Sequence, residues 1–93
     1  SMCPGKGLGL FRYIGELVND IYLSLGIHRK GIDFLSLDGK PVRIIFLLLA
    51  PKHREKEYID LIAQIFKIMS EESVRNQLIT AKTKKDILEA ISS

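Results

Sequence analysis

The chain has 93 residues, of which 46% are hydrophobic and 27% are charged, as expected for one globular domain spanning residues 1–93. The longest apolar run, residues 44–50, is far shorter than the ~20 residues of a membrane-spanning helix, so we expect no membrane insertion. The net charge is +3, and the basic residues form three groups at residues 28–30, 52–54 and 82–85. No aromatic residues interleave with these groups as stacking platforms, so we expect a solvated surface and no nucleic-acid partner.

No charged and then apolar leader opens the chain, so we expect no secretory signal. Ser1 before Met2 is expected to be the remnant of a tag. The single cysteine, Cys3, cannot form an internal disulfide, which agrees with a reducing compartment.

The first half of the chain predicts strands. Residues 2–9 are rich in glycine and proline, which indicates an irregular lead-in or loop. Residues 20–27 alternate between apolar and other side chains, which is typical of a strand with one buried face. After the turn sequence at residues 38–41, residues 42–49 are nearly all apolar and predict a strand buried on both faces.

The second half predicts three helices. From about Arg54, apolar residues recur at steps of three and four, which indicates an amphipathic helix. Ser70 is expected to cap a second helix. Thr83, followed three residues later by Asp86, is a capping-box signature for a third helix. Strands followed by helices predict a layered α/β (α+β) fold, with a sheet packed against helices.

An ordered series of segments resembles a known family. It comprises Gly31-Ile32-Asp33-Phe34, then Leu37-Asp38-Gly39-Lys40-Pro41-Val42, an apolar strand ending in Ala50-Pro51, Glu57-Tyr58-Ile59-Asp60-Leu61-Ile62-Ala63, and Ala81-Lys82-Thr83. These segments are similar to the fructose, mannitol and nitrogen-regulatory type of enzyme IIA (type 2) of the bacterial sugar phosphotransferase system (PTS). The likeness runs from about Gly5 to Ile91 and is strongest from Gly31 onward.

The resemblance implies a cytoplasmic phosphocarrier. A family member takes a phosphoryl group from the histidine phosphocarrier protein and passes it to a sugar-specific IIB domain, or signals through its phosphorylation state. The implied fold is a mixed sheet with helices on both faces, and no cofactor is implied. The sugar is chosen by the IIB and IIC components, so this sequence does not name it.

The chain departs from the family at two histidines. The resemblance places Arg12, which lies 22 residues before Phe34, where the family has its phosphorylated histidine. It places Tyr58 where a second, neighbouring histidine opens the family's helix. A phosphohistidine relay needs a neutral imidazole nitrogen as nucleophile, whereas arginine stays protonated and offers only donors. We therefore expect a degenerate domain that keeps the fold, is not an active enzyme, and acts through a partner.

Family domains are also longer than this chain. The resemblance makes residues 1–93 the C-terminal part of such a domain, without the N-terminal helices and first strand. Apolar surface that packs on those elements would then be exposed, and exposed apolar patches mark interaction sites. We therefore expect self-association into a homo-oligomer.

Two histidines remain, His28 and His53. His28 follows the strand at residues 20–27 and is expected on the surface. His53 lies between the buried strand and the helix, five residues before Tyr58, so it is the alternative phosphoacceptor of a working carrier. Cys3, His28 and His53 lack the spacing of metal ligands, so we expect no metal. Two alternatives stay open: a working carrier, through His53 or a different alignment, and an inactive fragment.

Overall fold

The computed structural model describes residues 2–33 and 36–92. Two features of the sequence analysis, the expected tag residue Ser1 and the aromatic residue Phe34, lie outside the described residues. Four strands come first: β1 (Met2–Gly5), β2 (Leu8–Gly15), β3 (Tyr22–Ile32) and β4 (Val42–Pro51). A short 3-10 turn, η1 (Lys52–Arg54), then leads into the helices α1 (Glu55–Met69), α2 (Glu72–Thr80) and α3 (Lys84–Ser92).

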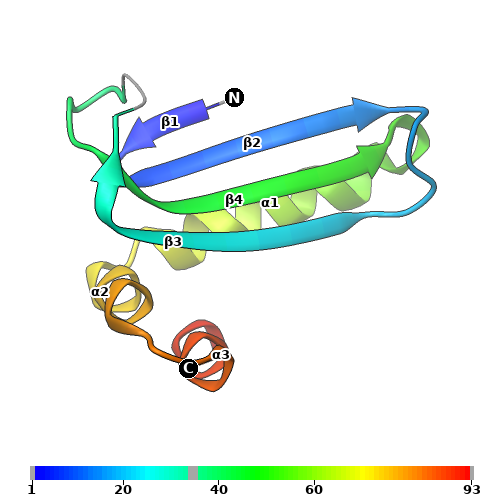
Figure 1. The fold of residues 1–93 in the computed structure, drawn as a ribbon. Coiled ribbons are helices and arrows are strands. Elements are labelled where there is room, and N and C mark those ends of the chain that lie inside the picture. Colours follow the sequence, from blue (N-terminus) through cyan, green and yellow to red (C-terminus); the bar gives the residue numbers. More distant parts are fainter. Residues whose placement is uncertain (1, 34–35, 93) are drawn as a thin grey trace.

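The strands form one mixed sheet in the order β1-β2-β4-β3. The two inner strands, β2 and β4, are parallel, while β1 and β3 run antiparallel to their neighbours. Figure 1 shows α1 behind β4, and α2 and α3 beyond the edge that β3 forms. The prediction of an α+β fold with a mixed sheet and three C-terminal helices is confirmed.

The prediction of a loop over residues 2–9 is wrong, because this segment forms a hairpin. Gly5 pairs with Leu8, which leaves Lys6 and Gly7 as a two-residue turn between β1 and β2. Both turn residues have positive φ, 60° for Lys6 and 74° for Gly7, as in the tight turns that match strand twist. A third residue with positive φ, Gly5, lets Asp38 come close, because a Cβ there would lie 2.9 Å from the Asp38 carboxylate carbon.

The strand predicted over residues 20–27 is found as β3, but it begins at Tyr22 and continues to Ile32. The pairing with β4 shifts between Ile27 and Ile32, so the strand passes through an irregularity and then continues. The charged residues 28–30 carry no apolar alternation, which explains why the sequence pattern stopped at residue 27.

The prediction that residues 42–49 are buried on both faces is wrong. Ile44 and Leu48 are fully buried, whereas Leu47, which points to the opposite face, is 43% exposed. Side chains alternate along a strand, so one face of β4 is covered and the other is open. In the described residues the helices lie on one face only, which also corrects the expectation of helices on both faces.

The core lies between the covered face of the sheet and the helices. Its strand residues are Leu8, Leu10, Ile44 and Phe46, and its helix residues are Ile65, Met69, Leu78 and Ala90. The apolar stripe predicted for the long helix is confirmed, because Ile65 and Met69 are buried on one side of α1. Each helix contributes at least one of these buried residues, so the sheet and the helices share a single core.

Of the two helix caps predicted from the sequence, at Ser70 and Thr83, one is found. The Thr83 hydroxyl accepts a hydrogen bond from the Asp86 amide at 3.1 Å, which confirms Thr83 as a cap of α3. The Asp86 carboxylate accepts from the amide of Lys82 at 3.1 Å and closes the turn before the helix. Ser70 does not cap α2. It ends α1, where its hydroxyl donates to the Lys67 carbonyl at 2.6 Å.

Candidate functional site

The carboxyl ends of β2 and β4 meet at one edge of the sheet. Gly15, at the end of β2, is paired with Pro51, at the end of β4, because the two strands are parallel and in register. The loop of residues 16–21 follows β2 at this edge, and η1 and the start of α1 follow β4. We call this region the carboxyl edge. Residues there are well placed for function, since loops at the carboxyl ends of parallel strands converge.

Arg12 lies in β2, three residues before the end of the strand, and pairs with Leu48 of β4. Its side chain is exposed, and no hydrogen bond or ion pair to it is found among residues 2–33 and 36–92. Arg12 follows Leu10 by two residues, so it shares the helix-covered face of the strand. The guanidinium is therefore a solvated cation near the carboxyl edge, with all of its donors available to an anion.

The other two candidate residues follow β4. His53 lies in η1, two residues after Pro51, and is exposed. Tyr58 lies one turn into α1 and is half-buried. The fold thus brings the segments that carry Arg12, His53 and Tyr58 to the same end of the sheet. His28 is elsewhere, because it lies toward the far end of β3, where its Nδ1 accepts a hydrogen bond from the Gly31 amide at 3.0 Å.

An ion cluster connects the two segments of the carboxyl edge. Arg54, at the end of η1, donates to Glu57 with an Nε–Oε1 distance of 3.0 Å, and it also donates to Asp20 in the loop after β2. Hydrogen bonds from the Ile21 amide and then from Arg54 lower the pKa of Asp20. The hydrogen bond from Arg54 lowers the pKa of Glu57, and the two carboxylates raise the pKa of Arg54. The cluster holds the loop against the start of α1.

Sequence reasoning missed this cluster. The spacing of Arg54 and Glu57, three residues apart on a predicted helix, is a signal that could have suggested their pair. Asp20 is 34 residues from Arg54 in the sequence, and only the fold brings the two side chains together.

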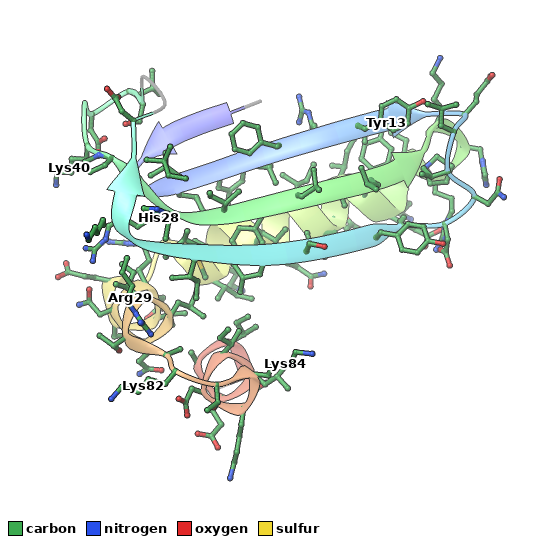
Figure 2. The ribbon with its side chains drawn as sticks, in the orientation of Figure 1. Tyr13, His28, Arg29, Lys40, Lys82 and Lys84 are labelled. Carbon is green, nitrogen blue, oxygen red and sulfur yellow. The ribbon has the colours of Figure 1, made fainter. Side chains whose placement is uncertain are left out.

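The sequence analysis also did not single out Tyr13 as a residue of this edge. Its ring lies over Gly15, because a Cβ on Gly15 would fall 2.2 Å from the Tyr13 hydroxyl oxygen. The hydroxyl accepts a long hydrogen bond of 3.4 Å from the amide of Leu17. Figure 2 shows Tyr13 at the end of β2, beside the loop that follows it. The loop carries Leu17, which is 85% exposed, at the rim of the carboxyl edge.

The described residues hold no group of three or more His, Cys, Asp or Glu side chains that could bind a metal ion. Among the same residues, no helix combines the length and the apolar character needed to cross a membrane.

Comparisons with known proteins point to one family. The family described as "Phosphoenolpyruvate-dependent sugar phosphotransferase system, EIIA 2" matches residues 2–93. A fructose-specific EIIA component of Haloferax volcanii is 23% identical over 88 residues, which cover 95% of this chain and 57% of the relative. A nitrogen regulatory protein homolog of Haemophilus influenzae is 38% identical over 56 residues, covering 60% of this chain and 34% of the relative.

A solved structure has the same fold. The nitrogen regulatory protein IIA-Ntr from Neisseria meningitidis has a TM-score of 0.91 and 24% identity, covering 98% of this chain and 62% of that chain. The chain therefore spans only part of the relatives that it matches. Because the family match extends over nearly the whole sequence, the chain belongs to the EIIA type 2 family of the phosphoenolpyruvate-dependent sugar phosphotransferase system.

Proposed function

We propose that this chain is a degenerate EIIA type 2 domain that binds PTS partners through its carboxyl edge and does not carry a phosphoryl group itself. The observation that carries the proposal is the residue at position 12. The resemblance aligns Arg12 with the family's phosphorylated histidine, and a guanidinium cannot act as the nucleophile. Tyr58, aligned with the second histidine, is a poor replacement, because a phenol lacks the ring nitrogens of an imidazole.

The scaffold around the lost chemistry is intact, which supports a binding role. The pairing of β2 and β4 continues to Gly15 and Pro51, and Arg54 ties the loop at residues 16–21 to α1. The segments that meet at this edge carry the exposed apolar residue Leu17 and the exposed cations Arg12 and Lys52. Such a surface suits a partner with an apolar contact and an anionic group. The proposed partners are the histidine phosphocarrier protein and a IIB domain, and the proposed location is the cytoplasm.

A second candidate is a working carrier that uses His53. One observation favours it: His53 is exposed at the carboxyl edge, and its ring makes no hydrogen bond to residues 2–33 or 36–92. A neutral imidazole with an accessible nitrogen is a competent nucleophile.

The test is the intact mass of the chain after incubation with phosphoenolpyruvate, enzyme I and the histidine phosphocarrier protein. We expect no change in mass, beside a control EIIA domain that gains one phosphoryl group. An acid-labile gain would overturn the proposal. Its loss in His53→Ala would then identify His53 as the acceptor, and its persistence would point to another residue.

A gain-of-function variant sharpens this test. Arg12→His/Tyr58→His places imidazoles at both aligned positions, and we expect it to accept one acid-labile phosphoryl group. The variant Arg12→Gln/Tyr58→Phe is the matched control and should stay unmodified.

Partner binding separates a degenerate domain from an inactive fragment. We expect saturable binding of the histidine phosphocarrier protein or a IIB domain in isothermal titration calorimetry, weakened by Leu17→Asp. Absence of binding to both proteins would favour the fragment.

We also propose that the chain forms a homo-oligomer through the uncovered side of its sheet. We define the open face as Tyr13, Tyr22, Ile45, Leu47 and Leu49, which the strand pairings place on one side. Tyr22 is 56% exposed and Leu47 is 43% exposed, so the face presents apolar surface to solvent. Two such faces can pack as a sheet-on-sheet pair around a twofold axis.

A further inference from the structure

The sheet has an unpaired margin along the second half of β2. In the described residues, β1 pairs with β2 at Leu8 and Leu10 and reaches no further along the strand. On its other side, β2 pairs with β4 along its whole length, as far as Gly15. Figure 1 shows β1 beside only the first part of β2. We call the margin of β2 over residues 12–14, beyond the end of β1, the free edge.

The main-chain groups of Arg12 and Ile14 point out of the free edge. The Gly7 carbonyl, just before β2, accepts a hydrogen bond from the Ile44 amide at 2.9 Å, so it faces β4. Main-chain groups alternate in direction along a strand, so those of the even-numbered residues of β2 face away from β4. The earlier even-numbered residues meet β1 there, whereas residues 12 and 14 lie beyond its end. Such unpaired N–H and C=O groups are a template for another strand.

The other outer strand, β3, carries protective features that the free edge lacks. Its pairing with β4 shifts between Ile27 and Ile32, and the charged residues 28–30 lie in this irregular part. Irregular pairing and edge charges are the means by which proteins protect a sheet margin from another strand. In contrast, β2 pairs with β4 without a shift, contains no proline, and has Arg12 as its one charged residue. The free edge is therefore the better surface for adding a strand.

The free edge is complementary to a second copy of itself. An antiparallel pair centred on Tyr13 places Arg12 opposite Ile14 of the second copy, and Ile14 opposite Arg12 of that copy. Because the main-chain groups of both residues point outward, both are hydrogen-bonded pairs. Tyr13 then lies opposite Tyr13 of the second copy, in the closer kind of pair, where aromatic side chains stabilise a sheet.

The charges at the free edge also fit a second copy. Arg12 is exposed, and so is Glu16, the first residue after β2. Neither side chain makes an ion pair with residues 2–33 or 36–92. In the pair centred on Tyr13, Glu16 of the second copy lies one diagonal step from Arg12, a distance that long side chains reach. A twofold axis repeats this contact, so both cations gain a carboxylate.

We propose that two copies of this chain join through the free edge of β2, in an antiparallel pair about a twofold axis at Tyr13, so that their sheets become one continuous sheet. Main-chain hydrogen bonds supply the affinity, as in other cases of strand addition, and the side chains of Arg12, Tyr13 and Glu16 set the register. The contact uses the margin of the sheet, so it is separate from the packing of open faces proposed above.

The test is sedimentation analysis of Leu47→Asp, in which a carboxylate blocks association through the open face. We expect this variant to form a concentration-dependent dimer. Adding Arg12→Pro removes an outward N–H from the free edge and should raise the dissociation constant at least about tenfold. The matched control, Arg12→Gln, removes the charge but keeps the N–H, and should raise it less than about threefold.

Two outcomes of the sedimentation analysis would overturn the proposal. One is a Leu47→Asp chain that stays monomeric at millimolar concentrations, and the other is an equal loss of association in Arg12→Pro and Arg12→Gln. Neither outcome bears on the open face, whose role is read from the comparison of Leu47→Asp with the wild type.

Amide hydrogen exchange tests the proposal even if Arg12→Pro does not fold. In Leu47→Asp, protection of the Arg12 and Ile14 amides should rise with protein concentration, because these amides gain partners only in the dimer. The Tyr13 amide already faces β4, so its protection should not change. Unprotected Arg12 and Ile14 amides in a dimeric sample would place the contact elsewhere and overturn the proposal.

Discussion

On one face of the sheet, Ile44 and Leu48 of β4 are fully buried beneath the helices; on the other face, their neighbour Leu47 is 43% exposed. The two faces are built from the same kinds of branched apolar residue. What separates them is the position of the helices, which cover only one side in the described part of the chain. An apolar residue therefore stabilises the monomer only where another element packs on it, and elsewhere it is surface for a partner.

The largest expected effect is a difference in stability between two truncations in the same strand, one on each face of the sheet. Leu48→Ala leaves a cavity in the core and should lower the free energy of unfolding by about 2–5 kcal/mol. Leu47→Ala removes the same atoms from the open face and should cost about 1 kcal/mol or less. Urea unfolding followed by circular dichroism measures both. Equal losses would show that the open face is covered in solution.

The open face should control self-association. Leu47→Asp places a carboxylate where two copies would meet, so we expect the dissociation constant of the oligomer to rise at least about tenfold. Sedimentation analysis over a range of concentrations measures it. Leu88→Asp, at a position on α3 that is 64% exposed, is the control and should leave association unchanged. A wild-type chain that remains monomeric at all concentrations would rule out this role.

A smaller effect concerns packing within the open face itself. Gly15→Ala puts a Cβ where the Tyr13 hydroxyl lies, so the tyrosine side chain must swing away, and we expect a loss of about 1 kcal/mol in stability. In a Tyr13→Ala background the same substitution should cost little. A double-mutant cycle in urea gives the coupling. Additive losses would show that the two residues do not contact each other.

The smallest effect is the pH dependence of the ion cluster at the carboxyl edge. Asp20 and Glu57 have lowered pKa values, from ordinary values of 3.8 and 4.5, because each accepts hydrogen bonds, including from Arg54. Their contribution to stability is fully present above those ordinary values and is lost as the pH falls through the lowered ones. Arg54→Gln should therefore flatten the acid dependence of the unfolding midpoint.

The same pH range contains other carboxylates with lowered pKa values, Asp38 and Asp86. Their contribution remains in Arg54→Gln, so the difference between the two pH profiles isolates the cluster. Parallel profiles would show that the cluster does not stabilise the fold.

The helical half of the chain was predictable because its signals are local. The apolar stripe of α1 and the cap at Thr83 depend on residues three or four positions apart, and both are found. The hairpin at Lys6 and Gly7 was not predicted, because glycine-rich sequence indicates a turn without telling whether strands flank it. Exposed apolar surface was expected, but its place on one face of the sheet was not predicted, because a continuous apolar strand does not reveal how many of its faces are covered.

Some residues of the candidate site were predictable from the sequence, and others were not. Arg12 and Tyr58 came from the ordered resemblance to the family, and His53 came from the search for a remaining histidine. The fold brings the segments that carry the three residues to one end of the sheet. The Arg54 cluster and the hydrogen bonds from Arg29 to the carbonyls of Ile79 and Ala81 join residues far apart in the sequence, and no local pattern signals such pairs.

By itself, the sequence determined the family resemblance, the α+β class and the three helices, because these depend on residue order and short-range periodicity. Only the tertiary structure decided which face of the sheet is covered, which loop Arg54 holds, and which part of β2 has a free edge. The physical reason is that burial, ion pairing and the exposure of a strand edge depend on distances in space, and strand pairing and helix packing set those distances across tens of intervening residues.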